Sequence, residues 1–207
     1  MRPITAHTGR AAVLRRSGVD TDQIVPAEFC KRLTKTGYAD VLFHTWRQDP
    51  WFELNDPARA SASVLLTGPD FGTGSSREHA VWALRDWGFA VVIAANFGDI
   101  FRRNALKNGL LAVSLPADTV SGLCDLAERD ADLEIDTDLH RCEVRAGGLT
   151  HPFDLDRRAR QLLMAGLDEI DSTLSREAAI EAYERDRPAW LPAVGTADSE
   201  LLARAEP

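Results

Sequence analysis

A glycine-rich loop between a strand-like run and a helical run most constrains the fold of this chain. Residues 63–67 form a short β-branched and aliphatic run, and residues 80–84 continue at helical spacing until Gly88. Between them lies the sequence GPDFGTGSSREH, residues 68–79. The pattern predicts a strand, a loop and a helix, in that order.

The start of the predicted helix is a candidate anion site. Ser75, with Glu78 three residues later, fits a capping box, so we expect the helix to begin at Ser75 and to end at Gly88. Its first amides and the positive end of its dipole would favour a carboxylate, phosphate or alkoxide in the loop. Arg77 adds a planar, two-pronged donor suited to a carboxylate.

Common glycine-loop motifs fit this loop poorly. A phosphate-binding P-loop needs a lysine after its last glycine, and none follows Gly74. A dinucleotide-binding fingerprint needs a third glycine where this chain has Arg77. A nucleophile elbow, G-x-S-x-G, is not matched. The plain alternative is a capped helix whose serines only satisfy backbone donors.

Four motifs in register make the chain resemble the aconitase superfamily swivel domain, and in particular the small subunits of 3-isopropylmalate dehydratase. They are VDTDQIVP at 19–26, GSSREHA at 74–80, FGDIF at 97–101 and NALKNGLL at 104–111. The resemblance extends over roughly residues 7–192. It implies an α/β fold, a swivelling β/β/α domain with a mixed, partly parallel sheet.

The resemblance also implies a reaction, in which 2-isopropylmalate is dehydrated and the alkene is rehydrated to 3-isopropylmalate, a step of leucine biosynthesis. In this family a serine alkoxide removes the proton while an iron–sulfur cluster takes the hydroxyl. Ser75 matches the base, Arg77 the arginine that binds the substrate carboxylate, and Ser76 a second hydroxyl contact. Thr73 is a further substrate-binding candidate. Nearby donors must stabilise the alkoxide, because a free serine hydroxyl is a very weak acid.

An aspartate near the start completes the catalytic candidates. Asp22 matches the family motif that brings an aspartate close to the base serine, although a solvated loop carboxylate is the plain alternative. The tripeptide DTD at 20–22 carries little information alone, since it recurs at 136–138, where we expect a turn between two strands. We expect Glu78 to be the capping-box partner and His79 a polar residue of the first helical turn.

Residues 27–34 correspond to the family's mobile loop that contributes to substrate choice. Its candidate substrate-binding residues are Phe29, Cys30, Lys31 and Arg32. Cys30 stands where bacterial relatives commonly have leucine, so a pocket for another 2-substituted malate, such as citramalate or homocitrate, is an alternative. A solvated basic pair is the plain alternative for the two cations.

Composition narrows the function further. The chain has 207 residues, 44% hydrophobic, enough for one substantial core. A formal charge of -8 without a long basic run argues against nucleic-acid binding, and no apolar stretch is long enough to cross a bilayer. The N-terminus lacks a secretory signal, so we expect a cytoplasmic protein. We expect a swivel domain with a C-terminal helical extension over residues 1–193 and a flexible tail over 194–207.

The three cysteines do not form a metal-binding pattern. Cys30, Cys124 and Cys142 are widely separated and contain no C-x-x-C pair, so they match neither a zinc site nor a cluster ligand set. We therefore expect reduced thiols and no metal bound by this chain alone. The resemblance implies that a separate large subunit carries a [4Fe-4S] cluster. The other expected ligand is a small dicarboxylate. The alternative from another functional class is a noncatalytic module that binds a carboxylate or phosphate metabolite.

The remaining sequence predicts scaffold. We expect strands at 89–95 and 110–115, a helix at 98–108, a helix ending near residue 129, a hairpin from 132–136 and 141–146, and a helix after residue 175. Alternating strands and helices imply a partly parallel core. We assign Arg102, Arg103 and Lys107 to the end of a helix rather than to the catalytic set. The five tryptophans are expected in the core or at a partner interface.

Overall fold

The computed structural model describes residues 1–188, 190 and 191. These divide into two compact units, Met1–Glu169 and a second that begins at Ile170. The flexible tail expected at 194–207 lies outside the described residues. No described helix has both the length and the apolar character needed to cross a bilayer.

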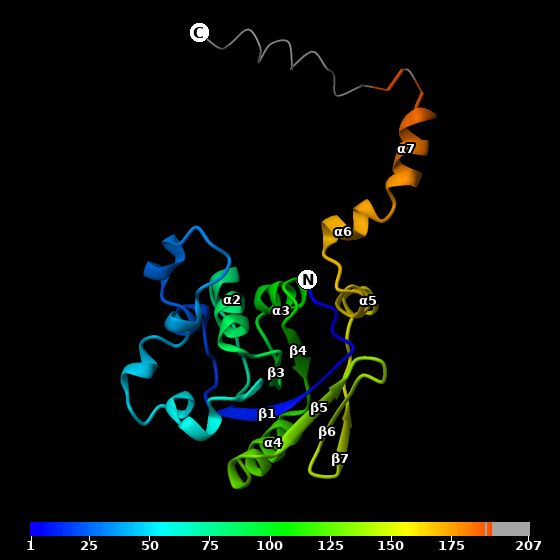
Figure 1. The fold of residues 1–207 in the computed structure, drawn as a ribbon. Helices are drawn as coiled ribbons and strands as arrows, with labels where there is room; N and C mark the ends of the chain where they lie inside the picture. Colours follow the sequence, from blue (N-terminus) through cyan, green and yellow to red (C-terminus); the bar gives the residue numbers. More distant parts are fainter. Residues whose placement is uncertain (189, 192–207) are drawn as a thin grey trace, which may run out of the picture. The chain divides into compact units, whose positions relative to one another are not determined.

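A seven-stranded mixed sheet forms the centre of the first unit, in the order β4-β3-β2-β1-β5-β6-β7 (Figure 1). The parallel half contains β1 (Ala6–Leu14), β2 (Val64–Thr67), β3 (Val91–Ala94) and β4 (Leu111–Ser114). The antiparallel half adds β5 (Glu134–Asp138), β6 (Glu143–Ala146) and β7 (Leu149–Pro152). Strand β1 joins the halves, because residues 6–10 pair with β5 and residues 11–14 pair with β2.

Helices cover both faces of this sheet. Helices α2 (Glu78–Trp87) and α3 (Asp99–Lys107) lie on one side, and α4 (Ala117–Arg129) lies on the other (Figure 1). Side chains alternate along each strand, so Leu65 packs toward α2 while Leu66 packs toward α4. Both faces are covered, which explains why β2 and β3 are uninterrupted buried runs.

A long connection between β1 and β2 carries short helical turns. It begins with α1 (Thr21–Ile24) and continues with five 3-10 turns: η1 (Ala27–Lys31), η2 (Ala39–Val41), η3 (Trp46–Gln48), η4 (Glu53–Asn55) and η5 (Pro57–Arg59). Aromatic rings fix this segment to the core, with Phe43 stacked on Trp46 and edge-on to Phe52. The connection therefore forms a packed subregion without regular strands.

The predicted scaffold is largely confirmed. The expected turn at 136–138 was wrong, because Asp136 and Asp138 belong to β5 and the turn follows them at 139–142. Cross-strand pairing with β1 extends β5 beyond the alternating run that the sequence showed. Trp82 is buried and Trp46 and Trp87 pack partly against the core, whereas Trp51 is 92% exposed.

Three helices follow β7 in the described part of the chain. Helix α5 (Arg157–Ala165) ends at the left-handed Gly166, and its Leu163 is buried in the first unit. The second unit carries most of α6 (Glu169–Leu174) and all of α7 (Glu177–Arg185). Helix α7 confirms the helix expected after residue 175, whereas α5 and α6 were not predicted.

Candidate functional site

The candidate residues lie where three loops meet beyond the carboxyl ends of β1, β2 and β3. Gly72 donates its amide hydrogen to the carbonyl of Val19 at 2.7 Å, and Thr21 donates to the carbonyl of Thr73 at 2.9 Å. Phe71 bridges to Phe97 in the loop after β3. Ligand sites in open α/β sheets commonly form at this edge, so the loops assemble the site where the topology favours one.

Backbone geometry explains the glycines of this loop. Gly72 and Gly74 have φ values of 74° and 88°, which L side chains rarely adopt. A Cβ on Gly72 would also overlap the Phe101 ring. Asp70 has a φ of 60°, and its amide donates to Asn96 Oδ1 at 3.0 Å while the Asn96 amide group donates back to its carboxylate. The loop is therefore held in one shape by contacts on both sides.

The capping prediction for Ser75 was wrong. Helix α2 begins at Glu78, its N-cap is Arg77, and no side chain caps it. Ser75 and Ser76 precede the helix and are exposed, and their hydroxyls have no hydrogen bond within the described chain. The positive φ of Gly74 and the hydrogen bonds from the α1 loop hold these residues outside helical geometry. Gly88 does end the helix with φ 120°, as predicted.

Arg77 and Asp22 form an ion pair beside the two serines. The Arg77 side chain is 17% exposed and the Asp22 side chain 55% exposed. Water therefore screens this ion pair less than it would screen a pair in which both side chains are exposed. Arg77 Nη1 is buried and has no well-formed hydrogen bond among the described residues, so the ion pair is its principal contact. The adjacent Asp22 carboxylate raises the pKa of Arg77 above its ordinary value.

Thr21 joins Asp22 to the serine loop, and sequence reasoning assigned it no role. Its buried hydroxyl donates to the carbonyl of Ser75 at 2.8 Å. Asp20 caps α1 in a capping box with Gln23, with bonds of 2.8 and 2.9 Å. The family motif thus contains the cap that fixes Asp22, yet nothing in the sequence identified Thr21 as the contact to Ser75.

The Phe29–Arg32 candidates separate into different environments. Phe29 packs against the core and lies edge-on to His44, with ring centroids 4.9 Å apart. Cys30 is half-buried near Arg77 and Asp22, and burial raises the pKa of its thiol. Lys31 is exposed. Arg32 turns away to bind Asp40 through both terminal nitrogens, each at 2.8 Å.

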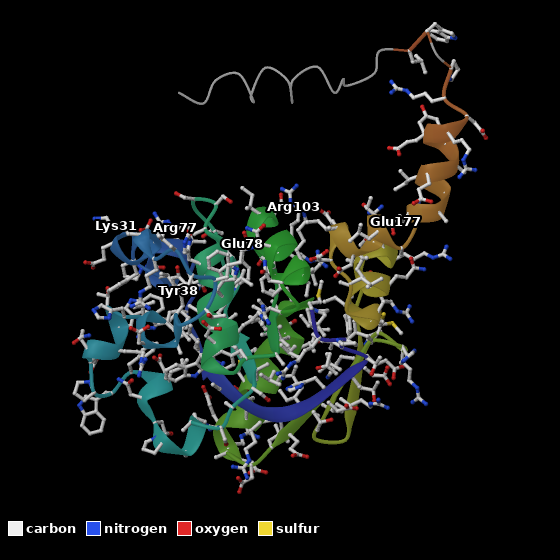
Figure 2. The ribbon with its side chains drawn as sticks, turned by 45° about the horizontal axis from the view of Figure 1, so that its top comes forward. Lys31, Tyr38, Arg77, Glu78, Arg103 and Glu177 are labelled. Atoms are coloured by element: carbon white, nitrogen blue, oxygen red, sulfur yellow. The ribbon has the colours of Figure 1, made fainter. Side chains whose placement is uncertain are left out.

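The remaining motif residues are structural in this arrangement. Glu78, which was expected to complete a capping box, instead accepts a hydrogen bond from Asn108 at 2.6 Å. His79 lies in the first turn of α2 and packs edge-on against Trp82, and burial lowers its pKa. Lys107, in the last turn of α3, pairs with Glu169 at 3.1 Å. Figure 2 shows Lys31, Arg77, Glu78 and Arg103 on the face that carries the serine loop.

The donor groups of the chain do not suit an iron–sulfur cluster. Cys124 is buried, and burial raises its pKa to about 11, which disfavours the thiolate that binds metal. Cys30 and Cys142 occupy separate parts of the fold and pack against different core clusters. Among the residues that the structure describes, no three His, Cys, Asp or Glu side chains are grouped to hold a metal ion.

Known proteins resemble this chain in both sequence and fold. Residues 1–118 match the family described as the aconitase C-terminal domain. The 3-isopropylmalate dehydratase small subunits of Acidothermus cellulolyticus and Frankia alni are each 58% identical over 93% of this chain and 98% of the relative. That of Streptomyces coelicolor is 56% identical over the same shares.

A solved structure agrees with this fold. The crystal structure of 3-isopropylmalate dehydratase from Methanocaldococcus jannaschii superposes with a TM-score of 0.65. It covers 86% of this chain and 98% of its own, at 23% identity. The likeness confirms the predicted α/β fold with a mixed, partly parallel sheet. By sequence, the chain belongs to the aconitase C-terminal domain family and, within it, to the 3-isopropylmalate dehydratase small subunits.

Proposed function

We propose that this chain is the small subunit of a two-subunit hydro-lyase that interconverts 2-isopropylmalate and 3-isopropylmalate in leucine biosynthesis. Identity of 56–58% to small subunits of that enzyme, over nearly their whole length, supports the activity. The observation that carries the catalytic assignment is the pair of exposed, unbonded serine hydroxyls beside the Arg77–Asp22 ion pair. These groups are available to a ligand because the fold gives them no other partner in the described chain.

In this proposal Ser75 is the base. Its alkoxide removes a proton from the substrate carbon next to a carboxylate, and in the reverse direction the hydroxyl returns that proton. The uncapped N-terminus of α2 follows Ser75 by three residues, and the Arg77 guanidinium adds a positive charge. Both favour the alkoxide over the neutral hydroxyl, which the chemistry requires.

Arg77 binds and orients the substrate in this proposal. Asp22 engages Nη1, which leaves the remaining guanidinium nitrogens for a substrate carboxylate. Asp22 thus positions Arg77, and Ser76 and Thr73 supply polar contacts from the same loop. Because Asp22 already holds the Arg77 guanidinium in place, less side-chain entropy is lost when the substrate carboxylate binds.

The loop at Phe29–Arg32 would meet the variable group of the substrate. Cys30 suits that role best, because its half-buried thiol is small and apolar and lies close enough to Arg77 and Asp22 to feel their charges. We propose that it contacts the isopropyl group, and that Phe29 supports it from the core side. Lys31 remains available to a carboxylate, and the Arg32–Asp40 pair holds the loop in place.

A large subunit would complete the active site. The small-subunit identity of the relatives implies such a partner. We propose that the partner carries the [4Fe-4S] cluster, which would assist departure of the hydroxyl, because the cysteines of this chain do not suit one. We also propose a cytoplasmic location, which suits three free thiols, and a swivel domain that spans residues 1–193 with its helical extension.

The test is reconstitution. The chain is mixed anaerobically with the cluster-loaded large subunit from the same genome, and consumption of 2-isopropylmalate is compared with that by each subunit alone. We expect turnover only in the mixture. A panel with citramalate and homocitrate tests the substrate, and faster turnover of another acid would replace isopropylmalate. A confirmed complex that is inactive on every acid would refute the catalytic proposal.

A further inference from the structure

A solvent-exposed leucine, Leu33, directly follows the candidate substrate-binding residues in the sequence. Leu33 is fully exposed, the most exposed of the large apolar side chains in the described chain. An isolated surface leucine needs no explanation by itself, because much of any protein surface is apolar. The surroundings of Leu33 make it informative.

The backbone around Leu33 is fixed by bonds that do not involve its side chain. The buried Tyr38 donates its hydroxyl hydrogen toward the carbonyls of Arg32 and Thr34, at 3.2 and 3.1 Å, on either side of Leu33. Arg32 makes a two-pronged ion pair with Asp40. In this structure the backbone on both sides of Leu33 is therefore bonded to a buried side chain, and the leucine side chain projects from it into solvent.

The support of this leucine is continuous with the candidate active site. The Tyr38 ring lies edge-on to His79 in the first turn of α2, with centroids 5.5 Å apart, and its amide donates to Asp86 at 2.9 Å. Three residues before Leu33, Cys30 lies near Arg77 and Asp22. Figure 2 shows Lys31 and Arg77 together at one end of the molecule, with Tyr38 beneath them. Chain continuity from Cys30 to Leu33 thus places the leucine within a few residues of the Arg77–Asp22 pair.

Exposed lysines beside Leu33 indicate the charge that a partner surface would need. Lys31 and Lys35 flank Leu33, are exposed, and have no hydrogen bond or ion pair within the described residues. They form a local positive rim on a chain whose formal charge is -8. A complementary surface has an apolar pocket bordered by carboxylates, because opposite charges steer association and fix its register.

We propose that Leu33 is an anchor that inserts into an apolar, acid-rimmed pocket of the large subunit. This inference rests on the proposed function and deepens it, since it names the contact that closes the partner over Ser75. Interface anchors are commonly apolar side chains surrounded by polar rims. Within this loop we assign Phe29 and Cys30 to the substrate, and Leu33 with its flanking lysines to the partner.

Affinity between the purified subunits tests this inference, by calorimetry or biolayer interferometry. We expect Leu33→Ala to raise the Kd about tenfold and Leu33→Asp about 100-fold, the range for losing an interface anchor. At saturating large subunit, kcat and KM should stay within about twofold. The control is Leu149 on β7, 53% exposed, whose Ala and Asp variants should leave the Kd unchanged. Both leucines are exposed, so thermal melts should match the wild type.

A second measurement isolates the rim charge. The wild-type Kd should rise with salt between about 50 and 500 mM, and Lys35→Gln should reduce that rise, because salt screens exposed charges. An unchanged Kd for Leu33→Asp refutes the anchor. A raised KM at unchanged Kd also refutes it, because Leu33 would then contact the substrate. A variant that loses only self-association refutes it as well, because Leu33 would then contact a second copy of the chain. If the wild-type chain binds no large subunit, the proposed function fails first, and the anchor fails with it.

Discussion

Replacing Gly98 with alanine tests whether contact between two loops positions Ser75, the proposed base. Gly98 lies in the loop after β3 and has φ −61° and ψ 132°, which alanine adopts readily. A Cβ there would overlap the carbonyl oxygen of Gly72 and lie 2.9 Å from its carbon and 3.1 Å from the Thr73 Cα. Relief requires the loops to separate by several tenths of an ångström to about 1 Å, measured against an ordinary carbon–carbon contact.

The cost has two parts. Overpacking costs about 1–3 kcal/mol and loss of the glycine N-cap about 1 kcal/mol, offset by about 0.4–1 kcal/mol from a stiffer unfolded chain. A net loss of about 2 kcal/mol lowers the Tm by about 4–8 °C for a chain of this size. Because Thr73 lies two residues before Ser75, a shift of about 1 Å lowers kcat about 100-fold.

The assay combines thermal melts with turnover by the reconstituted complex. Gly122→Ala is the matched control, because a Cβ there meets nothing within 4 Å and the residue lies inside α4. That variant should raise the Tm by about 2–4 °C, as alanine favours a helix by about 1 kcal/mol, and should leave kcat unchanged. Wild-type Tm and kcat for Gly98→Ala would refute the reasoning; a lower Tm with normal kcat would show that the contact stabilises the fold without positioning Ser75.

Three further predictions concern the serine, the buried threonine and pH. Ser75→Ala should lower turnover about 10²–10⁴-fold, with the free energy of unfolding changed by less than about 0.5 kcal/mol because the hydroxyl is exposed and unbonded; Ser61→Ala, also exposed, should leave turnover unchanged. Thr21→Val should cost about 1 kcal/mol and Thr21→Ser should restore it; equal melts for all three would discount the hydrogen bond. Burial lowers the pKa of His7 and His79 below the ordinary 6.5, so the unfolded chain binds more protons and the free energy of unfolding falls as pH drops below about 6.5. Urea melts of the wild type at pH 7.5 and 5.5 should show that fall, and the His7→Gln/His79→Gln variant should reduce it.

Local patterns predicted much of the scaffold. The aliphatic runs gave strands β2, β3 and β4, and Gly88 ended α2 as expected. These features depend on residue spacing and on glycine's freedom at positive φ, both of which can be read along the chain. The antiparallel extension of β5 was missed because it depends on pairing with β1, more than a hundred residues earlier.

The capping error shows where local reasoning stops. Ser75 and Glu78 have the spacing of a capping box, but Ser75 instead offers its carbonyl to Thr21, and Glu78 bonds to Asn108. Each of these partners lies at least 30 residues away in the sequence. Tertiary hydrogen bonds replaced the local cap and left the Ser75 hydroxyl without a partner in the described chain, so it is free to contact a ligand.

Motifs and periodicity identified the family, the order of strands and helices around the glycine loop, and the residues that we propose for proton transfer and carboxylate binding. Packing of the folded chain brings Asp22 to Arg77, turns Arg32 to Asp40 and leaves Leu33 exposed to solvent, and none of these could be predicted from local patterns. The physical reason is that helical and strand periodicities act over a few residues. Ion pairs, exposed anchors and unbonded hydroxyls depend on which distant segments pack together.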